Sequence, residues 1–210
     1  IELGGTTEAV WPWHRYVFEL AGPPPSGLDL LDVEDAALAA LRVWSEPTCT
    51  SWTVAYKGYV TTPARWGDGV NTIQWVHQGW ESVTALADAA SVTSLVYEES
   101  SAGAWSLVEA DIYLNAQDFR WSTAEPAPEG TVSLHAALLH EGGHVLGLLH
   151  PCELGGGGNA PDCNESDEYD DVAMNPEYAP QLRALGSDDV AGLCALYPSS
   201  RPVGNPGQGG

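Results

Sequence analysis

Short alternating stretches of apolar and polar residues predict most of the strands in this chain. Residues 14–20 alternate loosely, and residues 51–56 and 71–76 are runs rich in β-branched and aromatic side chains. Residues 91–99 and 107–115 have the same character, and the turn-forming sequence SSAGA lies between them. The pattern therefore predicts five strands, of which the last two form a hairpin.

Helical spacing of apolar residues is present in three longer segments. They are residues 32–46, 131–149 and 187–198, with Asp32 and Ser187 as the expected N-caps of the first and the last. Residues 82–90 could add a short helical turn. Five strands with few helices predict a mixed sheet and an α/β or α+β fold. We expect one domain over residues 1–198 and a flexible tail or linker over residues 199–210.

The composition fits a folded domain with an acidic surface. Of the 210 residues, 44% are hydrophobic and nine are tryptophan, which is enough for a sizeable core. The 29 acidic residues against seven basic ones give a net charge of −22, which repels nucleic acid and anionic membranes. The sequence contains no run of 18 apolar residues. We therefore expect neither a nucleic-acid partner nor a membrane partner.

The four cysteines include no CxxC pair, which argues against a zinc ribbon and favours two disulfide bonds formed in an oxidising compartment. Three pairings are open. We favour Cys152–Cys163, which closes a short loop, and this leaves Cys49–Cys194; four free buried thiols are the alternative. The chain begins at Ile1 rather than Met, which indicates a processed form or a fragment. We expect a secreted, extracellular protein.

The segment HEGGHVLGLLH, residues 140–150, carries the candidate chemistry. His140 and His144 are four residues apart, so on a helix both imidazoles project from one face, as zinc binding requires. Glu141 lies beside them as a candidate general base. Gly147 can end the helix in a left-handed conformation, which allows His150 to turn back as the third ligand. The full string matches the H-E-x-x-H-x-x-G-x-x-H pattern of metzincins.

An ordinary buried helix is the alternative interpretation, but it would bury four titratable groups within eleven residues without partners. The adjacent Gly142 and Gly143 need their own explanation, because each weakens the helix by about 1 kcal/mol relative to alanine. At Gly143 we expect a close backbone approach. Gly142 points away from the ligand face, and we expect a large neighbour, a tryptophan or the C-terminal helix, to fill the space beside it.

Met174 is the only methionine in the chain, and it lies 24 residues after His150. The metzincin pattern predicts a methionine-containing turn downstream of the third histidine. A core methionine that fills a packing gap is the alternative. The position and uniqueness of Met174 favour the turn.

These features resemble the metzincin zinc metallopeptidases and, among them, the matrixins, which are the matrix metalloproteinase family with its bacterial members. The resemblance spans residues 13–198 and rests on HEGGHVLGLLH, the methionine, PEY at residues 176–178 and SDDVAGLCALYP at residues 187–198. It implies a twisted five-stranded mixed sheet with an active-site helix. It also implies an N-terminal lobe of residues 1–147 and a small C-terminal lobe of residues 148–198.

The resemblance implies a role for each motif residue. His140, His144 and His150 would bind one catalytic zinc ion. Glu141 would act as the general base and then as the proton donor. Met174 would form an apolar floor under the metal.

The resemblance also implies how a substrate is held. Pro176 and Tyr178 would form the outer wall of the S1′ specificity pocket. One of Asp188 and Asp189 would tether the methionine turn. Residues 91–99 would be the edge strand that aligns a substrate peptide by main-chain hydrogen bonds.

The chain departs from the animal matrixins at their second, structural zinc. Asp111 is present, but Tyr113 and Leu114 stand where a histidine would be needed, and His14 and His77 are isolated. We therefore expect no second zinc ion. The acidic residues 162–171 could bind calcium, although a solvated loop is the favoured interpretation.

Together these observations predict a zinc-dependent endopeptidase that acts on a protein or peptide substrate as a monomer. A metzincin of another family and a non-catalytic zinc-binding module on the same fold are the alternatives. Zinc bound by the cysteines, with incidental histidines, is a third.

Overall fold

The computed structural model describes residues 9–62, 65–157 and 160–199, and its centre is a five-stranded sheet. The strand order is β2-β1-β3-β5-β4, and only the β4–β5 hairpin is antiparallel. The predicted mixed sheet is therefore confirmed, and β4 lies at its edge. The strand bounds are β1 (Arg15–Ala21), β2 (Thr53–Val60), β3 (Asn71–Val76), β4 (Ser91–Glu99) and β5 (Trp105–Asn115).

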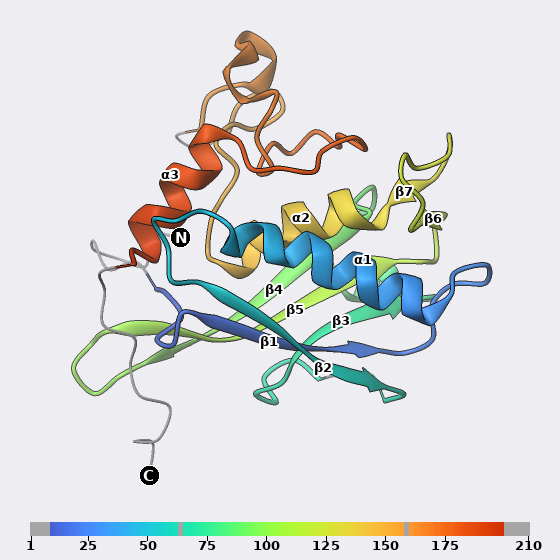
Figure 1. Ribbon diagram of the computed structural model, residues 1–210, viewed down its shortest axis with the longest axis horizontal. Helices are drawn as coiled ribbons and strands as arrows, with labels where there is room; N and C mark the ends of the chain where they lie inside the picture. Colours follow the sequence, from blue (N-terminus) through green and yellow to red (C-terminus); the bar gives the residue numbers. More distant parts are fainter. Residues whose placement is uncertain (1–8, 63–64, 158–159, 200–210) are drawn as a thin grey trace.

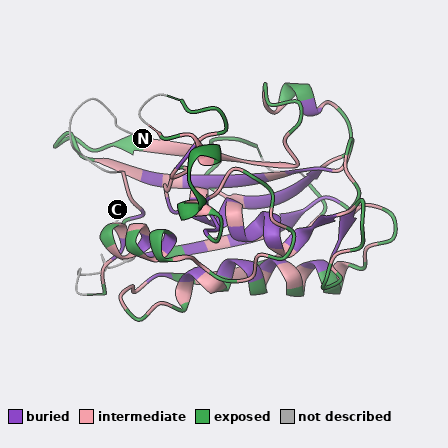
Figure 2. Ribbon diagram, turned by 90° about the horizontal axis from the view of Figure 1, so that it is seen from above, coloured by how far each residue is buried: buried purple, intermediate pink, exposed green. Residues whose placement is uncertain are grey.

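Three α-helices complete the described part of the chain: α1 (Leu30–Arg42), α2 (Leu134–Val145) and α3 (Ser187–Leu196). Helices α1 and α2 lie side by side on one face of the sheet, and α3 stands at one end of α2 (Figure 1). Buried residues concentrate where the inner strands meet the helices, whereas the loops are mostly intermediate or exposed (Figure 2). The core forms because apolar faces of helix and sheet leave water together.

Two predicted N-caps are wrong by a few residues. Helix α1 is capped by Asp29 rather than Asp32: the extended Asp29 accepts a hydrogen bond from the Leu31 amide at 2.9 Å, and Asp32 falls inside the first turn. Helix α3 is capped by Gly186 rather than Ser187. The Asp189 carboxylate takes over the capping role, since it accepts a hydrogen bond from the Gly186 amide at 2.7 Å.

Helix α2 is shorter than the predicted 131–149. It begins only at Leu134, because Val132–Ser133 form a short strand, β7, that pairs in parallel with β6 (Trp121–Ser122). Ser133 then caps the helix by accepting a hydrogen bond from the Ala136 amide. At the other end Gly147 has φ +90°, so the predicted left-handed stop is confirmed. Residues 82–90 form no helix beyond the short turn η2 (Trp80–Ser82).

After α2 the chain is mostly irregular until α3. It contains two single-turn segments, η3 (Cys163–Glu165) and η4 (Asp167–Tyr169), which lie in the predicted acidic loop. The structure has two disulfide bonds with the pairing favoured above. Cys152–Cys163 closes the loop after α2, while Cys49–Cys194 joins α3 to the segment that follows η1 (Val43–Ser45).

No helix of the described residues combines the length and the apolar character needed to cross a membrane. Residues 200–210, which contain nearly all of the predicted tail, lie outside the described residues.

Candidate metal centre

Helix α2 and the turn after it bring three histidines to one point. His140 and His144 lie one helical turn apart, and the turn at Gly147 returns His150 toward them. The Nε2 atom of His150 lies 3.2 Å from the Nε2 atom of His140 and 3.2 Å from that of His144. Across residues 9–62, 65–157 and 160–199, this is the one group of three or more His, Cys, Asp or Glu side chains whose ligand atoms gather within 4.8 Å.

The outer nitrogen of each ring has an acceptor. The Nδ1 atoms of His140 and His144 lie 2.7 Å and 2.9 Å from the carbonyl oxygens of Ala173 and Leu148, and that of His150 lies 3.2 Å from Glu153 Oε1. Each Nδ1 therefore carries the hydrogen, and three Nε2 lone pairs converge. Converging lone pairs repel one another unless they share a cation.

The donor set fits a tetrahedral metal ion. Zinc–nitrogen bonds of about 2.0–2.1 Å at tetrahedral angles place the nitrogens about 3.3 Å apart, close to the observed 3.2 Å. Three protein ligands leave a fourth position for water or substrate.

The environment also favours the neutral form of His140 and of His150. Burial lowers the pKa of His140 to about 4, while the neighbouring Glu141 carboxylate opposes the shift. Burial likewise lowers the pKa of His150. Near neutral pH both rings are in the unprotonated form that binds a metal ion.

Glu141 is buried, and hydroxyl groups of the edge strand hold its carboxylate. Ser91 Oγ donates to Oε1 at 2.8 Å, and Thr93 Oγ1 donates to Oε2 at 2.6 Å. Sequence reasoning missed Ser91 and Thr93 as site residues. The sequence could have indicated them, because Ser91 and Thr93 are alternate residues of a strand that was expected to border the site. Alternate residues of a strand face the same side of the sheet.

The two glycines of α2 make room for large side chains. A Cβ at Gly142 would lie 2.8 Å from Nε1 of Trp44, which follows α1 and donates to the Leu139 carbonyl at 2.8 Å. The expected large neighbour is confirmed as a tryptophan, not the C-terminal helix. At Gly143 the expected backbone approach is wrong: a Cβ would overlap Sδ of Met174 and touch the Trp44 ring.

Met174 lies directly beneath α2, in a turn held from α3. The buried Asp189 carboxylate accepts hydrogen bonds from the amides of Ala173 at 2.6 Å and Met174 at 3.1 Å. Of the two candidate tethers Asp189 is the one in contact, and Asp188 is exposed. Burial raises the pKa of Asp189, and the backbone amides partly offset that effect.

Two cavities adjoin His140 and Glu141. One, of about 270 Å³, has a largely apolar lining that includes Pro176 and Tyr178. Tyr178 accepts a hydrogen bond from the Ser133 amide at 2.5 Å, which fixes this wall to the start of α2. The other cavity, of about 330 Å³, lies along the residues of β4 between Ser91 and Leu95.

Other residues considered from the sequence lie elsewhere. His77 contacts the Pro23 carbonyl at 3.0 Å, and His14 contacts Ser51 at 2.6 Å. Asp111 is buried in β5, where it accepts hydrogen bonds from Thr72. None of the three joins the histidine cluster.

Comparison of the chain with models of protein families finds no match, and comparison with curated proteins finds none either.

Proposed function

We propose that this protein is a zinc-dependent endopeptidase of the metzincin type, resembling the matrixins. The observation that carries the proposal is the convergence of three Nε2 lone pairs beside a buried glutamate, next to an open edge strand. When bound there, zinc supplies Lewis acidity, which favours deprotonation of water near neutral pH and polarises a carbonyl group. The three histidines would hold the ion through Nε2.

Glu141 moves the proton in this proposal. One carboxylate oxygen takes a proton from the attacking water and later delivers it to the nitrogen of the leaving amine. Ser91 and Thr93 each use one lone pair of a carboxylate oxygen, so each oxygen retains another for this transfer. The two hydroxyls fix the direction in which the carboxylate faces.

A polypeptide substrate fits the surroundings. Among the described strands none pairs with the outer edge of β4, so its free main-chain groups can align an extended peptide. The cavity walled by Pro176 and Tyr178 would accept an apolar side chain, because carbon atoms dominate its lining. The two disulfides fit an extracellular protein, and we propose secretion as a monomer.

The deciding experiment compares the wild type with Glu141→Gln on quenched fluorescent peptides, while zinc content is measured in parallel. We expect the variant to retain one zinc ion and to lose about 10²-fold or more of kcat/KM. Cleavage by the variant at the wild-type rate would refute the proposed role of Glu141 as general base. A wild type that binds zinc but cleaves no peptide library would favour a non-catalytic module.

A further inference from the structure

One of the three histidines is supported differently from the other two. The acceptors for His140 and His144 are backbone carbonyls, whereas the acceptor for His150 is the carboxylate of Glu153 at 3.2 Å. The His150 side chain is also 23% exposed. The orientation of its ring therefore depends on where a loop side chain is held.

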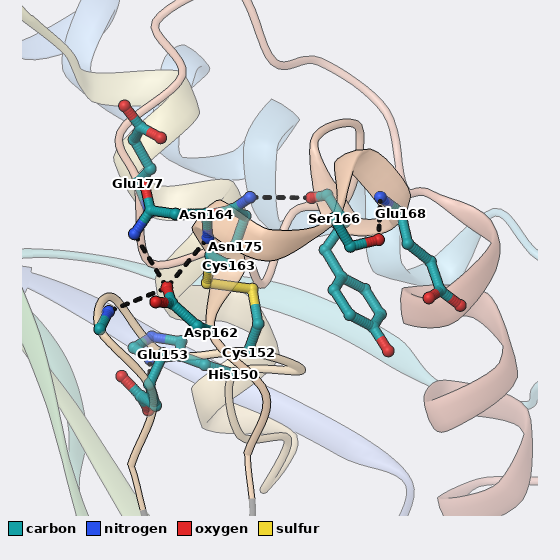
Figure 3. The surroundings of a disulfide bond; sticks show 12 residues. His150, Cys152, Glu153, Asp162, Cys163, Asn164, Ser166, Glu168, Asn175 and Glu177 are labelled. Carbon is teal, nitrogen blue, oxygen red and sulfur yellow. Dashed lines mark hydrogen bonds and ion pairs between the residues drawn. A yellow bond between two sulfur atoms is a disulfide. The ribbon is translucent and has the colours of Figure 1, made fainter.

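That loop is closed by the Cys152–Cys163 disulfide, in which Cys152 is fully buried. Glu153 is tied across the loop by its own backbone: its amide donates to the Pro161 carbonyl at 2.9 Å, and its carbonyl accepts from the Cys163 amide at 3.1 Å. These two bonds and the disulfide fix the Cα position from which the Glu153 side chain extends to His150. Figure 3 shows the disulfide beside Glu153 and His150.

Asp162 stabilises the far side of the same loop. Its Oδ1 atom accepts hydrogen bonds from the amides of Gly155 and Asn164, each at 3.0 Å, and from the Asn164 side chain at 2.8 Å. These interactions converge on the Asp162 carboxylate in Figure 3. The described residues of this loop therefore form a hydrogen-bonded support for Glu153, while most of the acidic residues 162–171 face the solvent, as expected from the sequence.

We propose that Glu153 is a positioning residue for His150, and that the disulfide-closed loop of residues 152–163 sets the affinity of the site for its metal ion through Glu153. The proposal rests on metal binding by the proposed site and not on peptidase activity. Glu153 selects the Nδ1–H tautomer of His150, fixes the plane of the ring and adds negative charge behind a cationic site. These effects strengthen binding at Nε2 without any contact between Glu153 and the metal.

The first test measures Zn²⁺ affinity of the metal-free protein in competition with a chromophoric chelator. We expect Glu153→Ala to bind Zn²⁺ about 10–100-fold more weakly than the wild type. Glu153→Gln should lose less, because its amide oxygen still accepts the Nδ1 hydrogen. Glu168→Gln is the matched control, since Glu168 is an exposed glutamate of the nearby acidic residues 162–171 and lies away from His150 in Figure 3. This variant should bind Zn²⁺ as the wild type does.

The second test asks whether the loop acts through Glu153. The double substitution Cys152→Ser with Cys163→Ser is measured in the wild-type and the Glu153→Ala backgrounds, with near-ultraviolet circular dichroism as the check of folding. We expect about a tenfold loss in the first background and little further loss in the second. Should the serine variant not fold, Asp162→Ala replaces it, because this substitution removes the carboxylate that accepts hydrogen bonds from Gly155 and Asn164. It is measured in the same two backgrounds, and we again expect a loss of Zn²⁺ affinity in the first and little further loss in the second.

Wild-type affinity in Glu153→Ala, or equal losses in both backgrounds, would overturn the inference. A wild type that binds no Zn²⁺ would overturn both the inference and the proposed function. A wild type that binds Zn²⁺ without cleaving peptides would leave the inference standing and refute only the peptidase.

Discussion

The carboxylate of Asp189 on α3 accepts a hydrogen bond from the backbone amide of Met174 at 3.1 Å, directly under α2, the helix that carries His140 and His144. The same carboxylate holds the Ala173 amide, and the Ala173 carbonyl accepts from Nδ1 of His140. Helix α3 is thereby connected to the first histidine of the motif through a single turn. The methionine turn is fixed from both sides.

Asp189→Ala should therefore weaken both the fold and the metal site. It leaves the buried amides of Ala173 and Met174 without their acceptor, and each such group costs about 1–3 kcal/mol. We expect urea denaturation to give an unfolding free energy lower by at least about 2 kcal/mol, with a weaker Zn²⁺ affinity. The exposed Asp188→Ala should remain within about 0.5 kcal/mol of the wild type.

Alanine at Gly142 or Gly143 should destabilise the protein, although it raises helix propensity by about 1 kcal/mol. The added methyl group meets Trp44 in the first case and the Met174 sulfur in the second. Overpacking of this kind costs about 1–3 kcal/mol. We expect the larger loss at Gly143 in thermal denaturation of the metal-free protein. A stabilising effect of either substitution would show that the packing around that glycine has room for a methyl group.

Thr93→Val should reduce turnover without reducing metal affinity. Valine keeps the shape of threonine but removes the hydroxyl that donates to Glu141 Oε2. Loss of a hydrogen bond to a charged group corresponds to about 1.5–3 kcal/mol, so kcat should fall about tenfold or more. Thr93→Ser keeps the hydroxyl and should recover most of the turnover. Equal activity of the valine and serine variants would contradict a positioning role for this hydroxyl.

Asp111 should make the free energy of unfolding decrease as the pH rises. Burial raises its pKa to about 6, helped by the negative charges of Glu109 and Asp68 and opposed by hydrogen bonds from Thr72. In the unfolded chain its pKa is about 3.9. The folded state therefore binds the proton more tightly, and this group's contribution to stability falls as pH rises from about 4 to 6 and is lost above that range.

The variant Asp111→Asn isolates this effect. Its unfolding free energy relative to the wild type should increase by about 1–3 kcal/mol between pH 4 and pH 7, because the wild type alone buries a charge at the higher pH. The measurement is urea denaturation of both proteins at a series of pH values. A constant difference between them would mean that the carboxyl titrates normally in the folded state.

Much of the site follows from local spacing. A four-residue interval on a helix places His140 and His144 on one face in any tertiary context, and a glycine after the helix supplies the turn that returns His150. The alternating pattern likewise predicted all five strands and their mixed sheet. Boundaries failed where tertiary contacts compete with propensity, as at Val132 and Ser133, which pair with β6 instead of extending α2.

The sequence by itself determined which three histidines gather and the class of fold, because both depend on the residue spacing within single helices, strands and turns. Only the tertiary structure decided that Trp44 fills the space beside Gly142, that Ser91 and Thr93 hold Glu141, and that Glu153 supports His150. These partners come from other strands, helices and loops. Their approach depends on how layers pack and how a disulfide closes a loop, which no local pattern of residues encodes.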